Sequence, residues 1–159
     1  MSAHSRYFNA NGLKLHYLDF GNPSKPPLIC LHGLSGNAHN FDGLATHLMN
    51  DYHVMSIDVR GRGDSEWGPP TEYLPQYYAA DLAAMLDEIG IERANLIGTS
   101  MGGVIAMMFA GGWPERAERI VLNDIGPDIA RMLPKQVRDL CGYRMHMGLG
   151  YSDPPSKPA

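Results

Sequence analysis

The chain has 159 residues, of which 44% are hydrophobic and 19% are charged, a balance typical of one water-soluble globular domain with a real core. The formal net charge is only -4 and the Lys and Arg residues are scattered, which argues against nucleic acid or an anionic membrane as a partner. No apolar run approaches the roughly 20 residues that span a bilayer, and residues 1–8 lack a signal-peptide pattern, so we expect a cytoplasmic protein.

The first predicted element is a β-hairpin over Tyr7 to Phe20. Asn11-Gly12 is a favoured two-residue turn, and the residues that follow it alternate between apolar and polar. Later apolar runs are short and bounded by turn residues, as is typical of strands buried on both faces. These predicted strands are Leu28 to Leu31, Val54 to Ile57, Leu96 to Ile97 and Ile120 to Leu122.

Helical patterns lie between these strands. Apolar residues recur at helical spacing from Tyr78 to Ile89 and the pattern ends at Gly90, while a second helix is expected from Ser100 towards Gly111. Strands that alternate with helices predict βαβ units. We therefore expect an α/β protein whose mostly parallel sheet has an antiparallel amino-terminal hairpin and helices on both faces.

The chain changes character after residue 130. Residues 131–159 mix Met, Arg and Gly and end in the proline-rich segment DPPSKPA, so we expect a helical stretch followed by disorder. We assign residues 1–130 to the folded core and residues 131–159 to an atypical tail. Cys30 and Cys141 have no disulfide or metal-knuckle spacing, so both are predicted to be reduced thiols.

The clearest chemical motif is G-x-S-x-G, formed around Ser100 by Gly98 and Gly102. It follows a predicted strand directly and precedes a predicted helix, which is the context of a nucleophile elbow. Glycines on either side allow a turn too tight for Cβ atoms, and the amino end of the next helix favours a developing oxyanion. The alternative is a glycine-rich turn that only packs or binds a phosphate.

Two further motifs follow predicted strands: LHGLSGN, which contains His32 and Leu34, and DVRGRGDS at Asp58 to Ser65. With GTSMGG in the expected order, residues 10–130 resemble the amino-terminal half of the α/β-hydrolase superfamily, especially bacterial esterases, enol-lactone hydrolases and carbon–carbon bond hydrolases. The resemblance implies an oxyanion hole made by the backbone N–H groups of Leu34 and Met101, a structural His32, and no cofactor or metal. Asp58, Arg60 and Asp64 are expected to hold their loop through side-chain to backbone hydrogen bonds.

The candidates for the acid and the base of a catalytic triad follow Ser100 in the chain. The family order is Ser, then Asp or Glu, then His, and the only histidine after Ser100 is His146. Asp124 follows the predicted strand Ile120 to Leu122, so Ser100, Asp124 and His146 form one possible triad. The alternative is that Asp124 caps a turn and His146 is a surface residue.

Family members usually run well over two hundred residues and add two more strands. If the sheet of this chain ends with Ile120 to Leu122, a strand that is normally central becomes an exposed edge. We therefore expect self-association, as a homodimer that covers this edge. A chain shortened by a frameshift is the other explanation of the abrupt change after residue 130.

Three functions compete at this stage. The first is a serine hydrolase that acts on a small ester, lactone or thioester through an acyl-enzyme at Ser100. The second is a non-catalytic remnant of the same fold that binds a small ligand or a partner. The third is nucleotide binding, which is disfavoured because the chain has neither G-x-G-x-x-G opening a first βα unit nor G-K-[ST].

Overall fold

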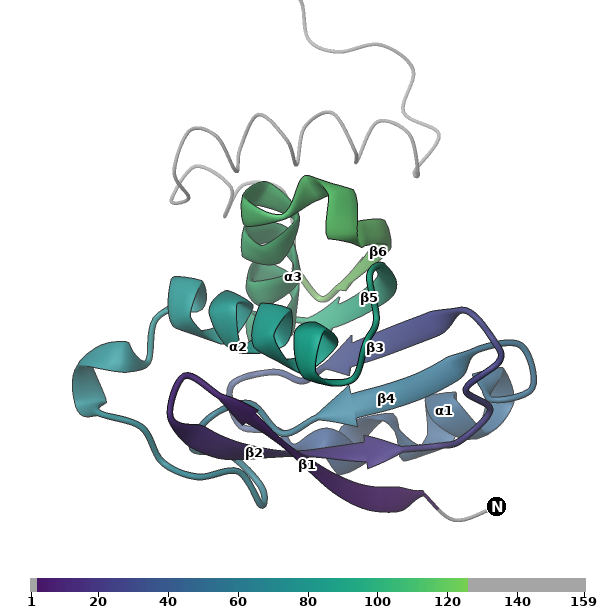
Figure 1. Cartoon of the computed structure of the whole chain (residues 1–159), viewed down its shortest axis with the longest axis horizontal. Helices are drawn as coiled ribbons and strands as arrows, with labels where there is room; N and C mark the ends of the chain where they lie inside the picture. Colours follow the sequence, from purple (N-terminus) through teal and green to yellow (C-terminus); the bar gives the residue numbers. More distant parts are fainter. Residues whose placement is uncertain (1–2, 126–159) are drawn as a thin grey trace, which may run out of the picture.

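A six-stranded mixed sheet organises residues 3–125, the part of the chain that the computed structural model describes (Figure 1). Its order is β1-β2-β4-β3-β5-β6. The first two strands pair antiparallel, as do β2 and β4, and the other pairs are parallel. The strands are β1 (His4–Ala10), β2 (Leu13–Asp19), β3 (Pro27–Leu31), β4 (His53–Ile57), β5 (Ala94–Thr99) and β6 (Ala117–Asn123).

Helices cover both faces of this sheet, so the predicted fold class is confirmed (Figure 1). One face carries α2 (Pro75–Glu88) and α3 (Met101–Gly112), and the other carries α1 (Asp42–Leu48). Three short 3₁₀ turns complete the described elements: η1 (Ala38–Phe41), η2 (Pro70–Glu72) and η3 (Pro114–Arg116). The predicted tail, with Cys141 and His146, lies outside the described residues.

The amino-terminal hairpin forms because its two-residue turn is built from residues that accept a left-handed backbone. Asn11 has a φ of 51° and Gly12 a φ of 81°. Positive φ at both central residues matches the right-handed twist of the flanking strands. The predicted hairpin is thereby confirmed, with Tyr7 paired to His16 in its register.

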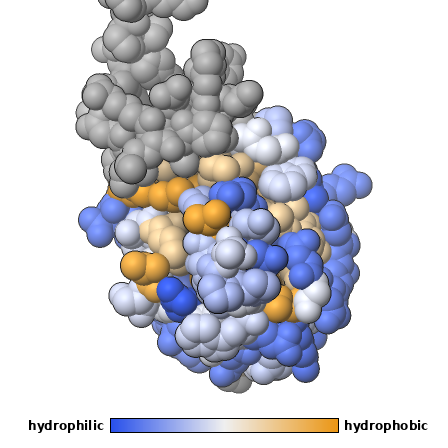
Figure 2. All heavy atoms as spheres, turned by 90° about the vertical axis from the view of Figure 1, so that its left-hand side faces the viewer, coloured by the Kyte–Doolittle hydropathy of each residue, from blue (hydrophilic) through white to orange (hydrophobic). Residues whose placement is uncertain are grey.

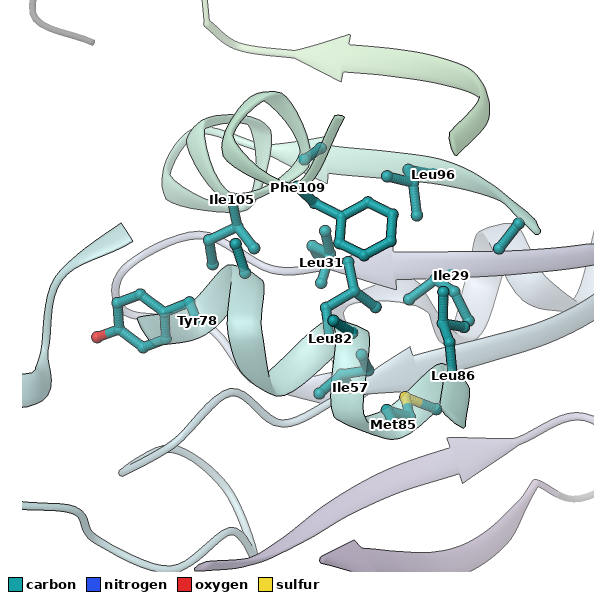
Figure 3. Packing of buried hydrophobic residues seen from close by; sticks show 14 of the residues in the cluster. Ile29, Leu31, Ile57, Tyr78, Leu82, Met85, Leu86, Leu96, Ile105 and Phe109 are labelled. Carbon is teal, nitrogen blue, oxygen red and sulfur yellow. The ribbon is translucent and has the colours of Figure 1, made fainter. Parts of the chain in front are cut away.

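The main core lies between the sheet and the two helices α2 and α3. Ile29 and Leu31 of β3 point towards Leu82 and Leu86 of α2, and Phe109 of α3 closes the same layer (Figure 3). Leu28 and Cys30, which alternate with them, face α1 instead. β3 is therefore buried on both sides, as its continuous apolar run predicts.

β6 is the last strand of the sheet in the described residues. β6 pairs only with β5 within residues 3–125, and the side chain of Val121 on β6 is 55% exposed. The predicted homodimer through the β6 edge stays a prediction.

None of the helices in this range combines the length and the apolar character needed to cross a bilayer.

Candidate active site

Ser100 alone makes the turn between β5 and α3. The strand ends at Thr99 and the helix begins at Met101, while Ser100 has a φ of 50° and a ψ of -112°. A positive φ is strained for a residue with a Cβ atom, and such strain persists only where neighbours hold it. Here the Ser100 N–H donates to the carbonyl of Asn123 at 2.9 Å, and its carbonyl accepts from the N–H of Gly103 at 2.9 Å.

The glycines on either side of Ser100 are required by contacts with backbone. A Cβ atom on Gly98 would lie 2.3 Å from the carbonyl oxygen of Gly102, and one on Gly102 would lie 2.0 Å from the carbonyl oxygen of Leu31. Both distances are far below van der Waals contact. The elbow expected from the sequence motif is therefore present, with Ser100 half-buried at its tip.

Gly102→Ala is expected to destabilise the protein by about 1–3 kcal/mol, because the new methyl group must push α3 away from β3. Gly112→Ala is the matched control, since a Cβ atom there meets nothing within 4 Å and the residue lies in the last turn of the same helix. Alanine is the better helix former, so the control is expected to be neutral or slightly stabilising. Urea unfolding of both variants measures the difference, and equal midpoints would contradict the tight elbow.

The loop after β3 lies directly against this elbow. A Cβ atom on Gly33 would sit 3.6 Å from the carbonyl oxygen of Thr99 and 3.7 Å from the Cβ of Ser100. Leu34, the next residue, lines the same open cleft as Met101. The two residues whose N–H groups are predicted to form the oxyanion hole are thus brought to one site, although their catalytic role stays a prediction.

His32 has the structural role that the resemblance implies. The ring is buried, its Nδ1 donates to the carbonyl of Gly33 at 2.7 Å, and its Nε2 accepts from the N–H of Val59 at 3.2 Å. Both ring nitrogens are therefore engaged in the neutral form, and burial lowers the pKa of His32. The imidazole holds the loop after β3 against the segment after β4.

Histidines 32 and 39 are expected to titrate on opposite sides of the ordinary pKa of 6.5. Burial favours the neutral form of His32, whereas the hydrogen bond from His39 to Asp42, 2.9 Å long, favours the charged form and raises its pKa. At pH 6.5 His32 will be mainly neutral and His39 mainly protonated. Imidazole NMR titration, assigned with His32→Gln and His39→Gln, checks this; a higher midpoint for His32 would contradict it.

Asp58 holds its loop through backbone hydrogen bonds, as expected. Its carboxylate accepts from the N–H of Ala38 at 2.6 Å and from the N–H of Asp64 at 3.0 Å. It also accepts from His16 Nδ1 at 2.7 Å. The Asp64 side chain is exposed, and Asp64 contacts Asp58 through its backbone N–H rather than through its carboxylate.

A chain of hydrogen bonds runs from Ser5 through His16 to Asp58, and sequence reasoning missed it. Ser5 Oγ lies 2.8 Å from His16 Nε2. The connectivity is that of a catalytic triad, but Ser5 lies near the start of β1 rather than at an elbow. His16, Asp58 and Asp64 also bring possible metal-ligand atoms within 4.8 Å of one another, yet the Asp58 oxygens already accept from N–H groups.

The expectation for Arg60 was wrong in the type of partner. Its guanidinium is completely buried and binds two carboxylates, those of Asp81 on α2 and Glu72 on η2, rather than mainly backbone. Nε and Nη2 donate to the two oxygens of Asp81 at 2.7 Å each, and Nη1 donates to Glu72 at 2.7 Å. A buried guanidinium needs an opposite charge, which the loop backbone cannot supply.

The predicted acid and base are placed only in part. Asp124 follows β6 directly, is exposed, and has a φ of 53°. The preceding residue, Asn123, accepts the backbone hydrogen bond from Ser100. Asp124 therefore directly follows a residue that is bonded to the elbow. Within residues 3–125 the Asp124 carboxylate makes no hydrogen bond or ion pair. His146 lies outside the described residues.

An open cleft of about 520 Å³ adjoins the elbow. Leu34 and Met101 line it next to Ser100, and Trp67, Tyr73 and Tyr78 form much of the remaining wall. The β3 and β4 arrows point to the left in Figure 1, and that side faces the viewer in Figure 2, where hydrophobic residues lie exposed among hydrophilic ones. Small-molecule sites of α/β sheets lie at this edge, outside the carboxyl ends of the strands.

Residues 26–141 match the family model described as alpha/beta hydrolase fold. This match covers more than half of the chain, so the protein belongs to the alpha/beta hydrolase fold family. A solved alpha/beta hydrolase from Novosphingobium aromaticivorans is 42% identical with a TM-score of 0.74, and the match covers 82% of this chain and 49% of that one. Epoxide Hydrolase A from Mycobacterium thermoresistibile is 29% identical, with a TM-score of 0.72 over 76% of this chain and 39% of its own.

Curated relatives are also hydrolases. The 3-hydroxybutyrate-oligomer hydrolase of Cupriavidus necator is 37% identical over 132 residues, which are 82% of this chain and 44% of that protein. The sn-1-specific diacylglycerol lipase of Mus musculus is 36% identical over 117 residues, 72% of this chain and 37% of its own. The chain thus spans less than half the length of these two relatives.

Proposed function

We propose that this chain carries the nucleophile of a serine hydrolase that cleaves carboxylic esters, lactones or thioesters through an acyl-enzyme at Ser100. The observation that carries the proposal is the strained, half-buried elbow at Ser100, packed against the Gly33 loop. A backbone conformation that costs energy is expected at a reactive centre, and Met101, the residue after Ser100, lines the open cleft. The ester-cleaving relatives, a hydroxybutyrate-oligomer hydrolase and a lipase, support the same reaction class.

The proposed reaction has two halves. The Ser100 oxygen bonds to the substrate carbonyl carbon while its proton passes to a base, and the carbonyl oxygen becomes an oxyanion between the N–H groups of Leu34 and Met101. The bond to the leaving oxygen or sulfur then breaks, and that atom takes the proton. An ester or thioester releases an alcohol or thiol, whereas the hydroxyl formed from a lactone stays attached to the acyl group. Water adds to the acyl-enzyme in the same way, which releases the carboxylic acid and restores the Ser100 hydroxyl.

Asp124 and His146 remain the proposed acid and base. Their order after Ser100 is that of the family, and Asp124 follows the strand whose last residue binds the Ser100 backbone. In this proposal His146 accepts the serine proton and Asp124 orients the imidazole. His32 is excluded from the role of base because both of its ring nitrogens are already bonded to backbone groups.

Covalent labelling by a fluorophosphonate tests the proposal, because this reagent needs an activated serine and not merely a binding pocket. The full chain is expected to be labelled and Ser100→Ala is expected not to be. Ser5→Ala is the matched control, since Ser5 is the other serine whose hydroxyl contacts a histidine paired with Asp58. Labelling that persists in Ser100→Ala but disappears in Ser5→Ala would move the nucleophile to β1. An unlabelled full chain would favour the non-catalytic remnant.

A further inference from the structure

The guanidinium of Arg62 lies beside the oxyanion loop and uses only part of its donor capacity. Nε donates to the carbonyl of Leu34 at 2.8 Å, and Nη1 donates to the carbonyl of Gly61 at 3.0 Å. An arginine has five N–H donors, so these two bonds leave three, including both on Nη2. The geometry fixes the planar group at one wall of the cleft while part of its edge stays available.

The charge of Arg62 also lacks a partner within residues 3–125. Four other arginines of this part form ion pairs: Arg6 with Asp19, Arg60 with Asp81 and Glu72, Arg93 with Glu118, and Arg116 with Asp87. The hydrogen bonds of Arg62 go to neutral carbonyl groups instead. A partly buried cation held by neutral acceptors retains a strong attraction for an anion, because the apolar surroundings screen it less than water does.

The cleft itself makes this attraction selective. Arg62 is the only charged residue among the described residues that line it, and no carboxylate competes on the wall. The remaining surface is largely aromatic and apolar, with Trp67, Tyr73, Tyr78 and Pro70 among its members. Such a wall suits a short hydrocarbon chain, and the single guanidinium suits one carboxylate at the end of that chain.

We propose that Arg62 binds a carboxylate on the substrate, so that the site takes anionic esters, meaning esters of dicarboxylic acids or of hydroxy acids with one free carboxylate. This inference rests on the proposed function, since it names the substrate class of the same site. The hydrogen bond from Arg62 Nε to the Leu34 carbonyl holds the guanidinium in a fixed position relative to the loop after β3. One rigid group then positions both the substrate carboxylate and the loop that carries a predicted oxyanion donor.

A matched pair of substrates tests the inference with the full chain. Mono-4-nitrophenyl glutarate carries a carboxylate where 4-nitrophenyl pentanoate carries a methyl group, and the measured quantity is the ratio of the two kcat/KM values. Arg62→Gln is expected to lower this ratio by about tenfold, the loss of one charge-assisted contact. Arg62→Lys keeps the charge but not the planar fork, so its ratio is expected to fall between those of the unchanged chain and Arg62→Gln. Arg93→Gln, just before the first residue of β5, controls for net charge.

The ratio separates binding of the carboxylate from the positioning of Leu34. Loss of the contact to the Leu34 carbonyl lowers turnover of both esters together and cancels in the ratio. An unchanged ratio in Arg62→Gln, with both esters still hydrolysed, would overturn the inference and leave the proposed function intact. A ratio lowered equally by Arg93→Gln would also overturn it, because the effect would then be one of net charge.

Binding without chemistry separates the two proposals if neither ester is hydrolysed. Isothermal titration of glutarate into Ser100→Ala is expected to give a Kd about tenfold lower than into the double variant Ser100→Ala/Arg62→Gln. That result would support the anion site even where the nucleophile assignment has failed. Equal Kd values for the two proteins, or the absence of binding to both, would overturn the anion site.

Discussion

Replacing Ser100 with alanine is expected to lower kcat for 4-nitrophenyl butyrate by at least about a thousandfold. The hydroxyl is the group that forms the covalent bond in the proposed mechanism, so its removal leaves only the contribution of the cleft and the backbone donors. The substitution removes one oxygen from a half-buried side chain that has no cap hydrogen bond. Stability is therefore expected to change little, and the loss is chemical.

Rates of 4-nitrophenyl butyrate hydrolysis by the purified full chain and by Ser100→Ala measure this effect, with Ser5→Ala as the matched control. Ser5 is an exposed residue of β1, so its variant is expected to hydrolyse the ester at the rate of the unchanged protein. Urea unfolding of all three proteins excludes a folding defect. Equal rates for Ser100→Ala and the unchanged chain would reject Ser100 as the nucleophile.

Asp81→Ala is expected to destabilise the folded state by about 3–5 kcal/mol. The variant leaves the guanidinium of Arg60 completely buried without the carboxylate that accepts two of its N–H groups. The hydrogen bond from Asn11 to Asp81, 2.7 Å long, is lost as well, so the hairpin turn is released from α2. Arginine is not deprotonated in proteins, so Arg60 cannot relieve this cost by losing its proton.

Two control variants locate the cause of this destabilisation. Asp87→Ala breaks the ion pair with Arg116, but the Asp87 side chain is 71% exposed, so a loss of about 0–1 kcal/mol is expected. The double variant Arg60→Met/Asp81→Leu removes both charges and is expected to be more stable than Asp81→Ala alone. If Asp81→Ala unfolds at the same urea concentration as Asp87→Ala, the buried pair is not a major source of stability.

The elements that sequence patterns predicted well are those with a local cause. The hairpin follows from Asn11-Gly12, and α2 follows from its apolar stripe and ends within two residues of the predicted Gly90. Sequence analysis did not single out α1, because this helix has only seven residues and Ala45 is its one buried side chain. Such a helix offers almost no periodic signal, and its packing against β3 is a property of the assembled sheet.

In the candidate site, too, the features with a local cause were predicted and those that depend on distant contacts were not. Ser100 and the two loops beside it could be found because glycine spacing reports a backbone that only tight turns adopt. The partners of Arg60 and His16 could not, since Asp81 lies 21 residues from Arg60 and Asp58 lies 42 residues from His16. Spacing gives no information on which distant carboxylate a folded chain will bring to a buried cation or imidazole.

The backbone hydrogen bond from Ser100 to Asn123 ties the turn at Ser100 to the last residue of β6, which has a single neighbouring strand within residues 3–125. Strands paired on one side open locally at a lower free energy than strands in the centre of a sheet. The amide of Ser100 will therefore exchange with deuterium faster than those in the middle of β3. On gradual warming, the proposed ester hydrolysis is expected to decline while circular dichroism still reports an intact core.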